Sequence, residues 1–151
     1  MSKLVINKYV NISNEIQKKQ LEMSKVSQMR PPSKGNENRV KVNLCVIVLE
    51  TYKKVKLTSG SEVQTFLVSD ESASIILSLW DGKGDQITNG DILLLESAYS
   101  NLHHKSLTLY CGAGGSIFKL GDFFFAYDDS LNMSNKSWER DENTGIWSMK
   151  N

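Results

Sequence analysis

The chain has 151 residues and a mass of 17.0 kDa, which fits one domain of ordinary size and leaves little for a second. Hydrophobic residues make up 40% of the chain and charged residues 23%, so a packed core is feasible and wholesale disorder is not. No apolar run approaches the ~18 residues that a membrane span requires, and Leu4-Val5-Ile6 is too short for a signal-peptide core. We therefore expect neither a membrane protein nor a secreted one.

Positive charge is concentrated at the start of the chain. Residues 1–38 carry seven Lys or Arg against three Asp or Glu, a net charge of +4. Residues 39–135 carry eight against eleven, a net charge of −3, and residues 136–151 carry three of each. Because no basic field covers the whole chain, a nucleic-acid-binding function must rest on local chemistry.

The first segment, residues 1–36, is polar and lacks a sustained period. Its apolar residues Ile12, Ile16 and Met23 predict at most one weak amphipathic helix. The consecutive prolines and the glycine of Arg30–Asn36 are typical of a linker, because proline interrupts a helix and glycine adds backbone freedom. We expect residues 1–36 to form a flexible basic extension.

A β pattern begins at Val40. In Val40–Leu49 the alternate aliphatic residues fall on one side, as in a strand with one buried face. Turn signals separate the further expected strands, which are Glu62–Ser69, Ser74–Trp80, Ile92–Tyr99, Ser106–Tyr110 and Phe123–Tyr127. This spacing indicates an all-β sandwich or small barrel over residues 37–130, followed by a short polar C-terminal tail over residues 131–151.

Two of these strands place an aromatic residue on their polar face. The pleat has a period of two, so the core set of both strands is Ile75, Leu77, Leu79, Leu107 and Leu109. Trp80 shares the other face with Ser74 and Ser78, and Tyr110 shares it with Thr108. Exposed rings stack on nucleic-acid bases for ~1–3 kcal/mol each. The alternative is that both rings fold over the barrel ends as part of the core.

Tyr99 does not follow the same pattern. It has the parity of Leu93 and Leu95, so simple alternation places it on an apolar side. A bulge in Ile92–Tyr99 would reverse that placement, but the sequence does not show one.

No residue pattern indicates catalysis or a metal. His103 and His104 are adjacent and would point in opposite directions on a strand, and no nearby Cys or Asp completes a metal set. Gly112–Gly115 lacks the Gly-Lys-Ser/Thr ending of a phosphate loop and is more typical of a hairpin turn. Cys45 and Cys111 lie in apolar runs and provide no disulfide framework, which indicates a reducing compartment, the cytosol or the nucleus. We expect no enzyme, no metal and no cofactor.

Four strings then carry a resemblance to a known family. They are Val46-Ile47-Val48-Leu49-Glu50-Thr51, Leu79-Trp80-Asp81, Asn89-Gly90-Asp91-Ile92, and Leu107-Thr108-Leu109-Tyr110 with its following glycines. In order and spacing they closely resemble the SOSS-B family of the SOSS complex, over about residues 40–134. The resemblance implies a five-stranded Greek-key OB-fold barrel that binds single-stranded DNA in the nucleus. It also implies a role in the DNA damage response, in double-strand break repair and in homologous recombination.

The resemblance also assigns site residues. Trp80, Tyr99 and Tyr110 match three stacking aromatics of the family, and His103 occupies the fourth position, which is usually Phe. The remaining candidates for backbone contacts are Lys53, Lys54, Lys56, His104 and Lys105.

The chain departs from the family at three positions that affect affinity. Ala113 stands where the family commonly has Arg, and Gln64 and Leu67 occupy positions where basic residues are expected. Each lost phosphate contact weakens binding and lowers its salt dependence by roughly 0.7 per charge.

A protein partner is implied as well. Members of the family dock onto an Integrator-complex scaffold subunit, and the matching segment here is Asp122-Phe123 with its surroundings. Two alternative functions remain open: a protein-interaction OB-fold scaffold protein with weak or no nucleic-acid binding, and a single-stranded RNA binder. We expect no membrane and no small-molecule substrate as partners.

Overall fold

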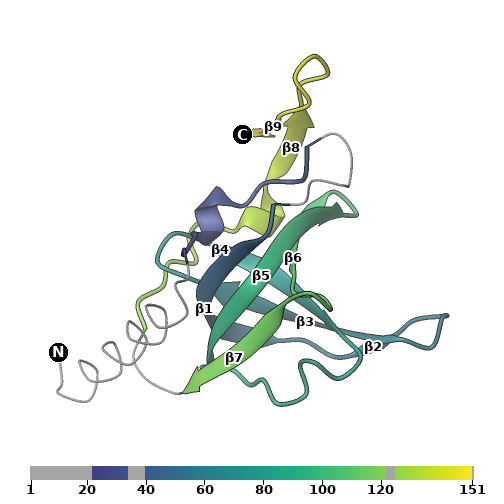
Figure 1. The fold of residues 1–151 in the computed structure, drawn as a ribbon, viewed down its shortest axis with the longest axis vertical. Helices are drawn as coiled ribbons and strands as arrows, with labels where there is room; N and C mark the ends of the chain where they lie inside the picture. Colours follow the sequence, from purple (N-terminus) through teal and green to yellow (C-terminus); the bar gives the residue numbers. More distant parts are fainter. Residues whose placement is uncertain (1–21, 34–39, 122–124, 151) are drawn as a thin grey trace.

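The computed structural model describes residues 22–33, 40–121 and 125–150. Its main sheet closes into a ring (Figure 1), because β1 pairs with both β3 and β5. The ring runs in the order β1 (Val42–Thr51), β3 (Glu62–Ser69), β4 (Ser74–Trp80), β6 (Ser106–Tyr110) and β5 (Ile92–His103). Only β4 and β6 pair in parallel within this ring. This is the five-stranded Greek-key topology of the OB fold, and the predicted fold class is confirmed.

Further strands in the described part of the chain accompany the ring. β2 (Val55–Lys56) pairs with the start of β3, and β7 (Ser116–Gly121) pairs with the first half of β5. β8 (Ser137–Arg140) and β9 (Trp147–Lys150) form a separate hairpin. Two short 3-10 helices, η1 (Val26–Gln28) and η3 (Met133–Asn135), complete the described elements. None of the described helices has the length and apolar character needed to cross a membrane.

The predicted core set is confirmed. Ile75, Leu77, Leu79, Leu107 and Leu109 are each at most 1% exposed. The alternation in β1 is also confirmed for Leu44, Val46 and Val48, whereas Val40 precedes the strand and is 75% exposed.

The polar faces of β4 and β6 are more enclosed than the alternation alone indicates. Ser74, Ser78 and Thr108 are themselves buried. The backbone N–H of Ser74 donates to the carbonyl of Leu131 at 2.8 Å, so the C-terminal segment covers the start of this face.

Two strand assignments are corrected. β5 continues to His103, four residues beyond the expected strand Ile92–Tyr99. β7 is absent from the expected strands. The turn Gly112–Gly115 leads from β6 to β7. Both of these strands pair with β5, so they do not form the expected hairpin with each other. The expected strand Phe123–Tyr127 lies partly outside the described residues, and residues 125–127 carry no strand.

A bulge in β5 reverses the side on which Tyr99 lies. Ser97 has a φ of 57°, and the register with β1 shifts so that Leu44 lies opposite Leu95 but Val42 lies opposite Ala98. Leu95 and Ala98 both belong to the buried core although they are three positions apart in the chain. The extra residue therefore turns Tyr99 to the outer face.

Both terminal segments contribute to the core. Val26 and Met29, in the predicted extension, are 0% and 4% exposed, and Met133, in the predicted tail, is 0% exposed. Within residues 22–33 and 131–150, the side chains that pack onto the barrel are Val26, Met29 and Met133, with Leu131 and Trp138 partly buried against it. Isolated apolar residues without a period do not reveal such packing, because it depends on the barrel surface that they meet.

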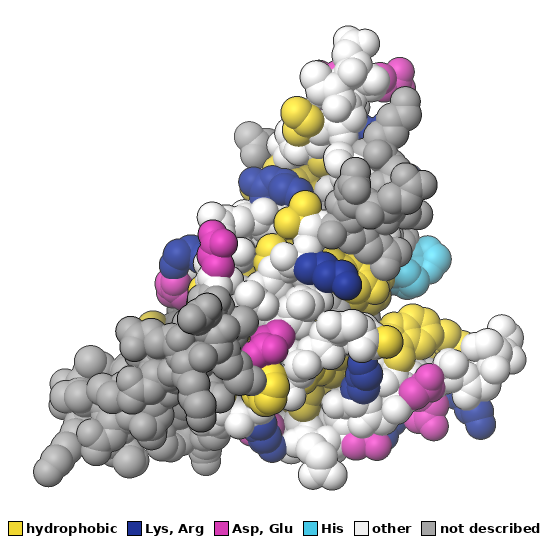
Figure 2. Space-filling view, viewed as in Figure 1, with side chains coloured by type: hydrophobic (Ala, Val, Ile, Leu, Met, Phe, Trp, Pro, Cys, Tyr) yellow, Lys and Arg dark blue, Asp and Glu magenta, His cyan; other side chains and the backbone are white. Residues whose placement is uncertain are grey.

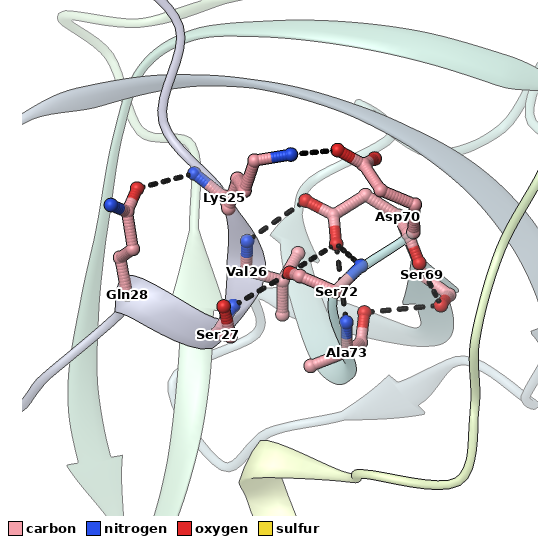
Figure 3. Close-up of polar contacts among 9 residues, drawn as sticks. Lys25, Val26, Ser27, Gln28, Ser69, Asp70, Ser72 and Ala73 are labelled. Carbon is pink, nitrogen blue, oxygen red and sulfur yellow. Dashed lines mark hydrogen bonds and ion pairs between the residues drawn. The ribbon is translucent and has the colours of Figure 1, made fainter.

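The turn between β3 and β4 holds the N-terminal segment (Figure 3). The carboxylate of Asp70, which is 2% exposed, accepts the backbone N–H of Val26 at 2.8 Å. It also accepts the N–H of Ser72 at 2.8 Å and that of Ala73 at 3.2 Å. Ser27 N–H donates to the Ser72 hydroxyl at 3.0 Å. One buried carboxylate thus joins η1 to the barrel.

Candidate nucleic-acid interface

Three aromatic residues lie on the same outer face of the barrel, on three neighbouring strands. Trp80 ends β4 and is 42% exposed, whereas its neighbour Leu79 is buried. Ser78, on the same face of β4, lies opposite Tyr110 of β6, and Tyr110 lies opposite Tyr99 of β5. We refer to Trp80, Tyr110 and Tyr99 as the aromatic platform. The sequence prediction of an exposed Trp80 is confirmed.

The two tyrosines of the platform stack on each other. Their ring centroids are 5.6 Å apart and their planes differ by 24°. Both side chains are half-buried. Since each ring turns one face toward the other, the pair presents one two-ring surface rather than two independent stacking positions.

The histidines form a second group on the same strand pair. His103 has the parity of Tyr99 but lies about 13 Å further along β5, at roughly 3.3 Å per residue. His104 and Lys105, with φ values of 49° and 68°, make the two-residue turn into β6. The His103 and His104 rings contact each other edge to face, with their ring centroids 4.2 Å apart. The fourth predicted stacking position is therefore separate from the platform, at the tip of the β5–β6 hairpin.

The predicted lysines between β1 and β3 have acidic neighbours. Lys54 forms an ion pair with Asp85, and the hydrogen bond and charge of that carboxylate raise the Lys54 pKa. Lys56 lies opposite Glu62 in the pairing of β2 with β3. Lys53 is exposed in the preceding loop. A phosphate that approaches Lys54 thus competes with Asp85.

The described surface carries both signs of charge side by side. Figure 2 shows Lys and Arg side chains interspersed with Asp and Glu over one face, and the histidines together at its edge. This agrees with a formal net charge of +1 for the whole chain. Attraction of a polyanion must come from individual cations beside the platform.

One such cation is missing from the sequence-based candidates. The ammonium of Lys83, in the loop after β4, donates to the carbonyl of Gly112 at 2.9 Å. The two residues are 29 positions apart in the chain, and no local pattern connects them. Only the folded barrel brings this side chain to the platform.

The remaining sequence candidates are placed as follows. Asp122 and Phe123, the predicted partner-binding residues, lie outside the described residues. Cys45 and Cys111 are free cysteines, and burial raises the pKa of both thiols, that of Cys45 to about 12. Within the described ranges no group of three or more His, Cys, Asp or Glu side chains is placed to hold a metal ion.

Comparisons with known proteins support the fold. A hypothetical protein from Arabidopsis thaliana, solved in solution, matches with a TM-score of 0.62 at 20% identity over 82% of this chain and 90% of that one. The crystal structure of a domain of replication protein A from Methanococcus maripaludis matches with a TM-score of 0.54 at 18% identity, over 67% of this chain and 98% of that one. The second OB-fold domain of the same protein, solved in solution, gives 0.51 at 18% identity, over 68% and 99%.

Sequence comparisons add little. No protein-family model matches the chain. A UPF0182 protein of Desulfitobacterium hafniense is 28% identical over 89 residues, which is 59% of this chain but only 9% of the length of that relative. The chain therefore has an OB fold similar to domains of replication protein A, and this likeness by itself shows the fold alone.

Proposed function

We propose that this protein binds single-stranded DNA through the aromatic platform, without strong sequence preference and without catalysing a reaction. The observation that carries the proposal is Trp80, a large indole that is 42% exposed on the outer face of the barrel beside two stacked tyrosines. An indole in this position stabilises the folded monomer little. It stacks on a base for ~1–3 kcal/mol whichever base it is, because every base has a π-face.

The finer part of the proposal is a role like that of the SOSS-B proteins. The motifs over residues 40–134 support it, including Leu79-Trp80-Asp81 and Leu107–Tyr110. The protein would then act in the nucleus, in the DNA damage response and homologous recombination. An Integrator-complex scaffold subunit would be its partner, through Asp122 and Phe123.

The experiment is a fluorescence-anisotropy titration of labelled oligo(dT) with the full chain. We expect Trp80→Ala to weaken binding about 5- to 150-fold, which corresponds to ~1–3 kcal/mol, while the domain stays folded. Tyr127→Ala is the matched control, because Tyr127 is an aromatic residue that is 50% exposed. The backbone N–H of its neighbour Asp128 donates to the carbonyl of Asp70, which precedes β4, whereas Trp80 lies at the opposite end of that strand. An affinity of the Trp80 variant equal to that of the native chain contradicts the proposal.

A second candidate is a protein-interaction scaffold that does not bind nucleic acid. The observation that favours it is the acidic neighbourhood of Lys54 and Lys56, formed by Asp85 and Glu62. No binding of oligo(dT) by the native chain at low salt would support this reading. A competing RNA oligonucleotide of matched sequence decides between DNA and RNA, since a 2′-hydroxyl contact separates the two.

A further inference from the structure

The side chain of Lys83 reaches the aromatic platform from the loop that follows β4. Its backbone N–H donates to the carbonyl of Trp80 at 3.2 Å, so the chain turns back directly after the indole. Its ammonium donates to the carbonyl of Gly112 at 2.9 Å, just beyond Tyr110. Ser78 and Tyr110 lie opposite each other in parallel strands, and Trp80 and Gly112 each follow this pair by two residues.

Gly112 also lies beside the third member of the platform. A Cβ built on this glycine would stand 3.7 Å from the hydroxyl of Tyr99. The ammonium of Lys83 is therefore next to the ends of both aromatic strands, β4 and β6, and close to the ring that β5 contributes.

In the described part of the chain, Lys83 differs from two other lysines in its partner. Within residues 22–33, 40–121 and 125–150, no carboxylate forms an ion pair with Lys83, whereas Lys54 pairs with Asp85 and Lys119 with Asp91. Its partner at Gly112 is a neutral carbonyl, and an ammonium has three N–H donors. The ammonium is thus held in place by Gly112 and has further N–H donors available for an anion.

We propose that Lys83 is the phosphate contact of the aromatic platform, an inference that rests on the proposed function. When neighbouring bases stack on Trp80 and on the tyrosine pair, the phosphodiester between them passes the Lys83 ammonium. The ammonium then donates to a phosphate oxygen. The phosphodiester replaces water around the ammonium and releases a condensed counterion.

Two variants and one control test this assignment. Lys83→Gln removes the charge but keeps an amide donor for the Gly112 carbonyl, and Lys83→Arg keeps the charge. Lys150→Gln is the matched control, because it makes the same charge change on the separate β8–β9 hairpin. The measurement is the affinity for oligo(dT) over a series of salt concentrations from low to high salt, after thermal unfolding has shown that each variant is folded.

We expect the negative slope of log affinity against log salt to become shallower by ~0.7 in Lys83→Gln. This corresponds to a loss of affinity of about fivefold at roughly 0.1 M salt, which disappears near about 1 M. Lys83→Arg and Lys150→Gln should keep the native slope. A native slope in Lys83→Gln overturns the assignment, whether or not affinity is lost. A loss of the same size at every salt concentration has that slope and is the result of a misplaced Gly112 turn. If the native chain itself does not bind oligo(dT), the proposed function is wrong. If the native chain binds and only the slope of Lys83→Gln is native, the function stands and the assignment of Lys83 alone is wrong.

Discussion

At the residue scale, the carboxylate of Asp91 joins the turn directly before β5 to β7. Its Oδ2 atom accepts the backbone N–H of Thr88 at 2.8 Å and the ammonium of Lys119 of β7 at 2.9 Å. The residue is only 8% exposed. Burial by itself raises the pKa of this carboxyl, but the bonds from Thr88 and Lys119 outweigh burial, and the pKa is lowered.

The lowered pKa predicts an acid-dependent contribution to stability. A carboxyl whose pKa is lower in the folded state than in the unfolded chain stabilises the fold above its unfolded pKa of about 3.9, and this contribution disappears as the pH falls through the folded pKa. We expect Asp91→Asn to lower the free energy of unfolding by about 1–3 kcal/mol at neutral pH.

Urea denaturation at a series of pH values checks this prediction. The difference between the native chain and Asp91→Asn should shrink below about pH 4. A difference that stays constant from neutral pH down to strongly acidic pH would show that the ionised carboxylate contributes nothing.

The bulge in β5 is the decisive feature at the element scale. Ser97 adopts a φ of 57°, and its N–H donates to the side-chain carbonyl of Asn43 on β1 at 3.0 Å. Without the extra residue, Tyr99 would keep the parity of Leu95 and point into the core. The platform therefore depends on a backbone conformation, not only on the presence of the ring.

A β-branched residue should disturb this bulge, because positive φ values bring its branched side chain against the backbone. We expect Ser97→Val to lower the free energy of unfolding by about 1 kcal/mol and to weaken oligo(dT) binding. Glycine adopts a positive φ without strain, so Ser97→Gly should keep the native stability and the native affinity for oligo(dT). Urea denaturation and anisotropy measure the two effects. Equal behaviour of the two variants would show that the bulge does not control Tyr99.

At the scale of the whole molecule, the two terminal segments pack against each other as well as on the barrel (Figure 1). The indole N–H of Trp147 in β9 donates to the carbonyl of Pro32 at 2.8 Å. The guanidinium of Arg30 lies 5.4 Å from the ring centroid of Trp138 in β8. The hydroxyl of Ser100 donates to the Arg30 carbonyl at 2.8 Å, which ties this segment to β5.

This packing predicts that the stable unit begins before β1. Val26 and Met29 are almost fully buried, and burial of each side chain contributes about 1.5–3 kcal/mol. Against a total stability of about 5–15 kcal/mol, their loss is large. We expect a chain of residues 40–151 to unfold about 10 °C or more below a chain of residues 22–151. Circular dichroism melting curves measure the difference, and coincident curves would refute it.

The sequence by itself determined the strands of the barrel and the outward placement of Trp80. Both follow from the period of two that the pleat imposes on neighbouring residues, and this period is visible within a single strand such as Ser74–Trp80. The OB fold was implied by the resemblance to the SOSS-B family and is confirmed by the order in which the strands pair.

Only the tertiary structure decided where Tyr99, Lys83 and the terminal segments lie. Tyr99 depends on the bulge at Ser97, which is held by Asn43 on another strand. Lys83 meets Gly112 because parallel pairing brings two loop ends together, and the apolar residues of the termini are buried by barrel surfaces far away in the chain. Local periodicity carries no information about such contacts, since they exist only once the sheet has closed.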